Sequence, residues 1–190
     1  MSASIIIRHA ETKNKWDELS YSALLKLIRQ EIDPPIDTSM LIKQIDDKQV
    51  LNLMKKIKVI YVSPLKRALQ TAEYISAKTG IPIKIIPELR EVRFNALPLC
   101  VHKKGKEAIR DFLIGQIIKK SEKKSMKRRV NYLIELTKEE ALIITNSFLM
   151  RILFSELFRK KISQLRRDRR FTNYLTGFDC KNGKQLTFMM

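Results

Sequence analysis

Short apolar runs alternate along the chain with longer segments in which apolar residues recur at helical spacing. The runs of strand length are IIIR (5–8), KVIYVS (58–63), IKII (83–86) and ALIIT (141–145). Alternation of this kind is typical of helices that pack on both faces of a mostly parallel sheet. The pattern therefore predicts an α/β fold.

Helical periodicity covers most of the sequence between these runs. The predicted helices span residues 16–30, 38–56, 64–80, 106–118, 126–136 and 147–160. Pro34 and Pro35 interrupt the chain after the first helix, because proline removes a backbone donor and fixes φ. Pro64 is predicted to open its helix at the first turn, where proline is tolerated.

The C-terminal segment carries a hairpin signal. Asn182 and Gly183 lie between FDCK and KQLTF, which predicts a type I′ turn with positive φ at both central positions. The hairpin would add an antiparallel edge to the sheet. The sequence has no internal repeat, low-complexity segment or linker composition, so its 190 residues, 44% of them hydrophobic, predict a single domain over residues 1–190.

Composition narrows the class of protein. No stretch approaches the roughly 18 uninterrupted apolar residues of a membrane span, and MSASIII does not resemble a secretory signal, so we expect a cytoplasmic protein. Cys100 and Cys180 are too few for a disulfide framework. Together with His9 and His102 they lack the spacing of a zinc site, so no metal site is predicted.

The formal net charge of +18 is concentrated in two basic runs, residues 119–129 and 159–170, each with seven positive residues and one negative. Such charge attracts polyanions or phosphorylated partners, although two solvated helix faces would give the same runs. A nucleic-acid binder is the least favoured interpretation. The sequence has no helix-turn-helix, zinc-finger or RNP-like motif, and the runs contain almost no aromatic residues for base stacking.

Several polar residues directly follow the predicted strands. They are Arg8 and His9, Arg67, Glu91, and Asn146. Ligand sites of open α/β sheets form beyond the carboxyl ends of the strands, so these side chains are candidates for one site. Each has an ordinary structural interpretation by itself. Together they suit phosphoryl transfer, in which a neutral imidazole attacks phosphorus, guanidinium groups hold the oxygens, and a carboxylic acid transfers protons.

Four segments resemble the histidine phosphatase superfamily, also called phosphoglycerate mutase-like. They are RHAET (8–12), SPLKRALQTA (63–72), LRE (89–91) and ALIITNSFLMR (141–151), and the second is the most specific. The resemblance covers essentially the whole chain. It implies a three-layer α/β/α sandwich around a six-stranded sheet, with no metal and no organic cofactor.

The resemblance also implies a role for each matching residue. His9 would be phosphorylated, Arg8 and Arg67 would bind the phosphate, Glu91 would donate the proton, and Thr12 would line the pocket. The family also has an asparagine three positions after this threonine. The corresponding residue of this chain is Lys15, although Asn14 is adjacent to it.

The last block departs from the family pattern. The family has a second histidine followed by glycine directly after the strand, and this chain has Asn146 and Ser147. His102 lies in VHKKGK, which we expect to be a mobile loop, and is not an obvious substitute. Asn146 and Ser147 can still contact a phosphoryl group, but an amide carries no positive charge. Loss of one preorganised donor typically lowers turnover about 10²–10³-fold. The asparagine is either a deliberate replacement that traps a ligand or intermediate, or a natural lesion in a protein that now only binds phosphate. Accidental similarity in this last block is the third alternative.

Three functions therefore remain open. The first is a phosphatase that hydrolyses a phosphomonoester or phosphoprotein through a phosphohistidine at His9, weakened by Asn146. The second is a catalytically impaired module that binds phosphorylated ligands through the same arginines. The third is a mutase-type phosphotransferase, which the short length of 190 residues disfavours. All three predict an anionic phosphorylated small molecule or phosphoprotein as the partner.

Overall fold

The computed structural model describes residues 4–13, 19–44, 47–95, 97, 105–121 and 124–187. Its sheet has six strands in the order β3-β2-β4-β1-β5-β6. These strands are β1 (Ile5–Arg8), β2 (Val59–Val62), β3 (Ile83–Ile85), β4 (Ala141–Thr145), β5 (Thr176–Asp179) and β6 (Gln185–Thr187). Strands β1 to β4 pair in parallel, whereas β5 runs antiparallel to both of its neighbours. The mostly parallel sheet with an antiparallel C-terminal edge is as predicted.

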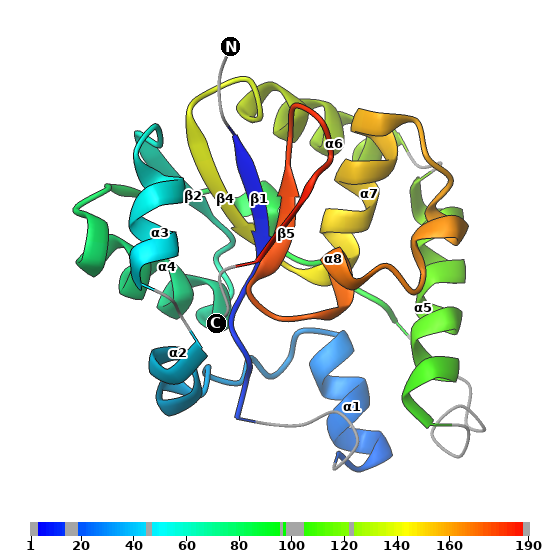
Figure 1. Ribbon diagram of the computed structural model, residues 1–190. Coiled ribbons are helices and arrows are strands. Elements are labelled where there is room, and N and C mark those ends of the chain that lie inside the picture. Colours follow the sequence, from blue (N-terminus) through cyan, green and yellow to red (C-terminus); the bar gives the residue numbers. More distant parts are fainter. Residues whose placement is uncertain are drawn as a thin grey trace.

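The helices connect the parallel strands and cover the sheet. They are α1 (Tyr21–Ile28), α2 (Thr38–Gln44), α3 (Asp47–Met54), α4 (Lys66–Thr79), α5 (Gly105–Ser121), α6 (Lys124–Leu136), α7 (Ser147–Phe158) and α8 (Arg169–Thr172), with short 3₁₀ turns η2 (Pro87–Leu89) and η4 (Ile162–Leu165). Helices α5, α6 and α7 lie on one side of the sheet and α3 and α4 on the other, while α1 lies beyond the carboxyl end of β1 (Figure 1).

Alternation along the strands gives the sheet two buried faces. Ile6 in β1 packs with residues of α5 to α7, whereas Ile5 and Ile7 pack with residues of α2 to α4. Successive side chains of a strand point to opposite faces, so one short apolar run supports both layers of helices. The α/β/α sandwich that the sequence predicts is therefore confirmed.

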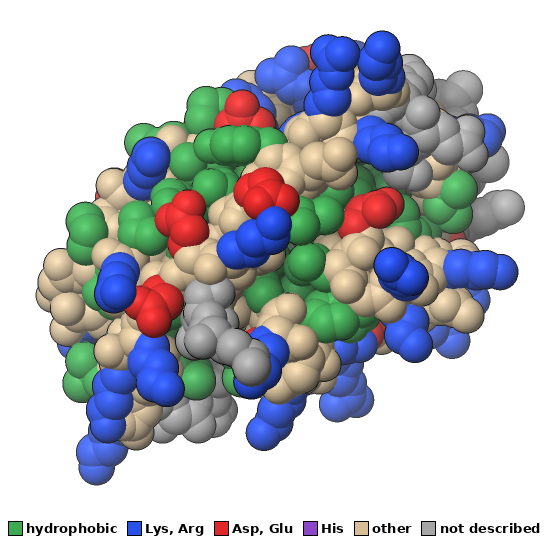
Figure 2. All heavy atoms as spheres, turned by 90° about the horizontal axis from the view of Figure 1, so that it is seen from above, with side chains coloured by type: hydrophobic (Ala, Val, Ile, Leu, Met, Phe, Trp, Pro, Cys, Tyr) green, Lys and Arg blue, Asp and Glu red, His purple; other side chains and the backbone are tan. Residues whose placement is uncertain are grey.

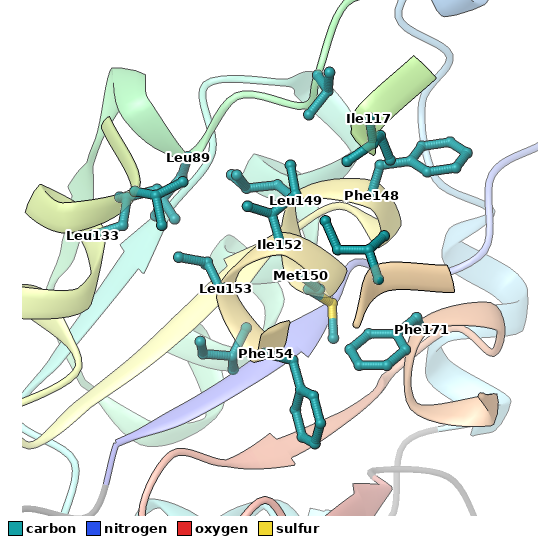
Figure 3. Packing of buried hydrophobic residues seen from close by; sticks show 14 of the residues in the cluster. Leu89, Ile117, Leu133, Phe148, Leu149, Met150, Ile152, Leu153, Phe154 and Phe171 are labelled. Carbon is teal, nitrogen blue, oxygen red and sulfur yellow. The ribbon is translucent and has the colours of Figure 1, made fainter. Parts of the chain in front are cut away.

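Helix α7 is the most enclosed helix of the first layer. Every residue from Phe148 to Phe154 is buried. Leu149, Ile152 and Leu153 point toward Leu89 and Leu133, while Phe154 lies near Phe171 (Figure 3). A helix that is apolar on all sides is held firmly by its neighbours, so the first turn of α7 has a fixed position at the end of β4.

The first two predicted helices are shorter in the structure. Ser20 is the N-cap of α1, and its Oγ accepts a hydrogen bond from the Ala23 N–H at 3.3 Å, so the helix begins at Tyr21. Residues 16–18 of the predicted helix lie outside the described residues. The helix predicted over 38–56 is the separate helices α2 and α3, and residues 45–46 between them are not described either.

Two turn predictions are wrong. Pro64 does not occupy the first turn of its helix, because Leu65 is extended at the N-cap and α4 begins at Lys66. The β5–β6 connection is not a type I′ turn. Only Gly183 has positive φ there (+69°), and its N–H bonds to the Asp179 carbonyl at 2.8 Å, which closes a longer loop than a two-residue turn. Helix α4 does end at Gly80, which adopts the left-handed C-cap conformation (φ +72°).

Strand β5 approaches β1 closely at Gly177. A Cβ built at this position would lie 1.7 Å from the Ile6 carbonyl oxygen, so only glycine fits. This close pairing fixes the C-terminal strands against the central strand. The segment just before β5, which contains Thr172 and Tyr174, is thereby held beside the carboxyl end of β1.

The positive charge is not confined to one face. Lysine and arginine side chains also surround the face at the amino ends of the parallel strands, where acidic and apolar side chains lie among them (Figure 2). Within the part of the chain that the structure describes, no helix has the length and apolar character needed to cross a membrane.

Candidate active site

The carboxyl ends of β1 and β4 border a cavity of about 160 Å³. All of the site residues predicted from the sequence line this cavity, namely Arg8, His9, Thr12, Arg67, Glu91, Asn146 and Ser147. They come from four separate segments of the chain, and parallel strands bring such segments to one edge of the sheet. Apolar side chains, including Phe94 and Phe148, form the rest of the wall.

His9 is fixed directly after β1. Its backbone N–H continues the pairing with β4 by bonding to the Thr145 carbonyl at 3.1 Å, and its side chain is buried. The ring Nδ1 lies 2.6 Å from the Ala10 carbonyl oxygen. A carbonyl only accepts hydrogen bonds, so Nδ1 carries the proton and Nε2 of the neutral ring keeps its lone pair.

The surroundings of His9 disfavour its charged form. Burial and the positive charges of Arg67 and Arg8 hold the pKa of His9 well below its ordinary value, and the bond to Ala10 opposes this shift only in part. The ring is therefore neutral at physiological pH. A neutral imidazole with a free Nε2 is the form that can act as a nucleophile.

Arg8 is the last residue of β1 and lines the same cavity. Its guanidinium carbon lies 4.0 Å from the centre of the Tyr174 ring, and Nη1 donates to the Thr172 carbonyl. The Nε atom is buried and has no hydrogen-bond partner among the described residues. A buried charged donor without an acceptor is costly, so this atom is free to bind an anion in the cavity.

Arg67 enters from the first turn of α4. Its Nε donates to Asn146 Oδ1 at 2.8 Å and its Nη1 to Asp33 Oδ1 at 2.8 Å. Asp33 also accepts the Lys66 backbone N–H at the start of α4. The Asn146 Nδ2 group lies 3.4 Å from Ser63 Oγ. Asn146 thus orients Arg67 through its oxygen and directs its amide donors elsewhere.

Glu91 caps α7 from outside the helix. Its Oε1 accepts the N–H groups of Val92 and Leu149, both at 2.9 Å, and Oε2 accepts that of Phe148 at 3.0 Å. Each carboxylate oxygen has two lone pairs in the carboxylate plane, so only Oε2 retains one for a proton. The N-cap residue itself, Asn146, makes no side-chain cap bond, because its oxygen is used by Arg67.

Sequence reasoning missed four residues of this region, namely Asp33, Arg110, Arg151 and Tyr174. Asp33 is absent from the resemblance, since its contact to Arg67 depends on the loop after α1. Arg151 ends the quoted last block, and its spacing from Ser147 is the one signal that could have placed it on the same side of α7. Of the other candidates, Asn14, Lys15, Cys100 and His102 lie outside the described residues.

The two basic runs are not simply solvated helix faces. The second run forms a turn, η4 and the start of α8. Its Arg170 bonds to Asp168 and to the Gly183 carbonyl, and lies 4.2 Å over the Phe154 ring. In the first run, Arg129 donates to the carbonyl oxygens of Glu88 and Arg90, and so holds the segment that carries Glu91.

The fold and the cavity define a class of α/β proteins with a histidine and arginines at the carboxyl edge of the sheet. The family model of the histidine phosphatase superfamily (branch 1) matches residues 4–187. The chain belongs to this superfamily. No curated protein matches it significantly in sequence. Within the described residues, no three His, Cys, Asp or Glu side chains are grouped so that they could hold a metal ion.

Solved structures share the fold at low sequence identity. A mycobacterial glucosyl-3-phosphoglycerate phosphatase matches with a TM-score of 0.57 and 14% identity, covering 87% of this chain and 83% of its own. A variant of phosphoserine phosphatase from Entamoeba histolytica, in complex with phosphoserine, matches with a TM-score of 0.54 and 18% identity, covering 98% and 94%. Phosphoglycerate mutase from Plasmodium falciparum has a TM-score of 0.46 and 20% identity, covering 88% and 81%.

Proposed function

We propose that this protein is a phosphatase that hydrolyses a phosphomonoester through a phosphohistidine at His9. The observation that carries the proposal is the state of His9: a buried, neutral imidazole whose Nδ1 bonds to Ala10 and whose Nε2 has no hydrogen-bond partner among the described residues, in a cavity that Arg8 and Arg67 also line. This arrangement provides a nucleophile and two cations for a phosphoryl group in one cavity.

In the first step, the lone pair of His9 Nε2 forms a bond to phosphorus as the bond to the ester oxygen breaks. Arg8 Nε and the guanidinium of Arg67 hold the phosphoryl oxygens, and Glu91 Oε2 delivers a proton to the departing oxygen. In the second step, Glu91 takes a proton from water as the water oxygen attacks phosphorus. The Nε2–P bond breaks, and His9 and inorganic phosphate are released.

A trapping experiment tests the role of His9. The protein is mixed with a ³²P-labelled phosphomonoester and quenched in alkali, where phosphohistidine survives and acyl phosphates do not. We expect label on His9 and none in a His9→Gln variant, with Glu73→Gln, at an exposed position of α4, as a control that keeps the label. A turnover-competent protein that carries label on Glu91, or no label at all under single-turnover conditions, would contradict the proposal.

A binding module is the second candidate function, and Asn146 is the observation that favours it. Asn146 uses its oxygen to hold Arg67 and brings no positive charge to the cavity. Phosphate affinity measured by calorimetry, together with turnover of several phosphomonoesters, separates the two functions. Micromolar phosphate binding without turnover, in both the natural chain and Asn146→His, would favour the binding module over the phosphatase.

The cavity also suggests the size of the substrate. Ligand pockets for drug-sized molecules typically measure about 300–1,000 Å³, and this cavity of about 160 Å³ is smaller. It is lined by Leu27 and Ile28 of α1, by Phe94 and Phe148, and by Tyr174. We therefore propose a small phosphomonoester, rather than a phosphoprotein, as the substrate.

A further inference from the structure

Arg151 is a buried cation in the cavity for which the phosphatase mechanism has no use. It lies one turn into α7, is 1% exposed, and belongs to the cavity wall. Its guanidinium donates only to neutral groups: Nη1 bonds to the Ser147 carbonyl at 3.0 Å and to the Ser147 hydroxyl, and Nε lies 3.4 Å from the Leu165 carbonyl. No described carboxylate forms an ion pair with it.

The position of Arg151 makes its charge more costly. Long side chains of a helix lean toward its N-terminus, and the bonds to Ser147 show that this guanidinium lies beside the first turn of α7. The N-terminus of a helix carries partial positive charge, so a cation there is unfavourable. Burial and the charge of Arg8 lower the pKa of Arg151 to about 9, and the nearby carboxylate of Glu91 offsets this shift only in part.

Nearby carboxylates compensate the charge of Arg151 only in part: Glu91 and Asp168 favour its charged form, but neither forms an ion pair with it. Glu91 is near enough to interact, but its oxygens accept backbone N–H groups of α7 and of Val92. Asp168 forms its ion pair with Arg170. The rings of Phe148 and Phe171 lie 5.4 Å from the guanidinium carbon and provide only a weak attraction. A buried charge of this kind is normally paired, so the missing partner is expected to be a ligand.

Arg151 and Arg67 reach the cavity from opposite sides of the sheet. Arg67 lies on α4, whose core residues pack on one face, and Arg151 lies on α7, which packs on the other. Arg110, on α5, lines the cavity on the same side as Arg151. A phosphoryl group between His9 and Arg67 therefore leaves a second positive region on the α5 and α7 side.

We propose that the region around Arg151 binds a second anionic group of the substrate. The substrate is then a small phosphomonoester that also carries a carboxylate or a second phosphate, which points toward α7 while the scissile phosphoryl group faces His9. Carboxylate and phosphate groups each present two oxygen atoms that a guanidinium can bind through two parallel N–H···O hydrogen bonds. This inference rests on the proposed phosphatase function.

Matched pairs of substrates test the inference. Each pair has the same linker and differs only in the terminal group: carboxymethyl phosphate with ethyl phosphate, carboxyethyl phosphate with propyl phosphate, and ethylene glycol bisphosphate with ethyl phosphate. We expect kcat/KM of the natural chain to favour the doubly anionic member of at least one pair about 10- to 100-fold, the effect of one hydrogen bond to a charged group. The carboxylate and bisphosphate pairs show which anion is preferred.

Variants assign the selectivity to Arg151. Arg151→Met should bring the ratio of the two kcat/KM values close to one, and Arg151→Lys should retain part of it. Arg166→Met is the control, because it removes an exposed arginine of the same basic region that pairs with Asp111, and should keep the natural ratio. If Arg151→Met does not fold, the natural chain and Arg151→Lys still provide the comparison.

Three results would overturn the inference. A ratio near one for every pair in the natural chain would exclude a second anionic group. Equal losses for both members of a pair in Arg151→Lys would place Arg151 on the scissile phosphoryl group instead. The same ratio in the natural chain and in the Arg151 variants would assign the selectivity elsewhere. If no ester is hydrolysed, the phosphatase proposal fails, and calorimetric affinities for the same pairs then decide the second site alone.

Discussion

Replacement of Asn146 by histidine should raise turnover. In the structure, Asn146 Oδ1 accepts the Arg67 Nε–H at 2.8 Å, and the amide brings no charge to the cavity. An imidazole at this position can accept the same bond through one nitrogen. When a phosphoryl dianion binds, this nitrogen can take up a proton in place of the Arg67 bond, and the resulting imidazolium then donates to a phosphoryl oxygen through its other N–H. Asn146 borders the cavity, which leaves space for the larger ring.

The expected increase in kcat follows from the replacement of a neutral hydrogen-bond donor by a charged one. Charge-assisted hydrogen bonds are roughly twice as strong as neutral ones, and one preorganised donor is worth about 10²–10³-fold in turnover. We expect kcat of Asn146→His to rise about 10²-fold, which corresponds to about 2.7 kcal/mol of transition-state stabilisation. Asn146→Ala should instead lower kcat/KM, because Arg67 Nε loses its acceptor.

Release of p-nitrophenol from p-nitrophenyl phosphate measures both effects in one assay. Thermal unfolding checks that each variant is folded, and calorimetry with inorganic phosphate measures whether the arginines still bind the anion. The reasoning is refuted if Asn146→His is folded and binds phosphate at least as well as the natural chain, yet shows no gain in kcat.

Further predictions concern His9, Glu91 and Gly177. The folded state holds the pKa of His9 below its unfolded value of about 6.5, so the unfolded chain binds more protons as the pH falls. The free energy of unfolding should therefore decrease as the pH drops below about 6.5. Denaturation of His9→Gln should show a smaller decrease over the same pH range. Glu91→Gln should lower kcat about 10²–10⁴-fold by removing the proton donor, and equal kcat values would exclude this role. Gly177→Ala should destabilise the protein by about 3 kcal/mol or more, because its Cβ would meet the Ile6 carbonyl oxygen, and an unchanged denaturation midpoint would contradict this close pairing.

Much of the fold could be read from local sequence. The apolar runs of β1 and β4 have strand length and are buried, and each is followed by polar residues that line the cavity. Parallel strands align their carboxyl ends by construction, so a residue that follows one strand must lie near those that follow its neighbours. This geometric rule and the resemblance together predict that His9, Arg67 and Asn146 lie close to one another.

Local turn chemistry was less informative. Asn182 and Gly183 suggested a two-residue turn, but the pairing of Asp179 with Lys184 requires a longer loop in which only the glycine has positive φ. The start of α4 is likewise fixed by the Asp33 side chain, which accepts the Lys66 N–H from a distant loop. Tertiary contacts decide such boundaries, because the same turn residues are compatible with several turn types and helix ends vary by one or two residues.

The sequence alone determined which residues meet at the edge of the sheet, since the order of strands and helices prescribes that convergence. Only the tertiary structure decided how those residues are used: that Asn146 orients Arg67, that Glu91 caps α7, and that Arg151 lies buried and donates to Ser147. Hydrogen-bond partners depend on ångström distances between segments far apart in the chain. Periodicity and motif spacing contain no information about those distances.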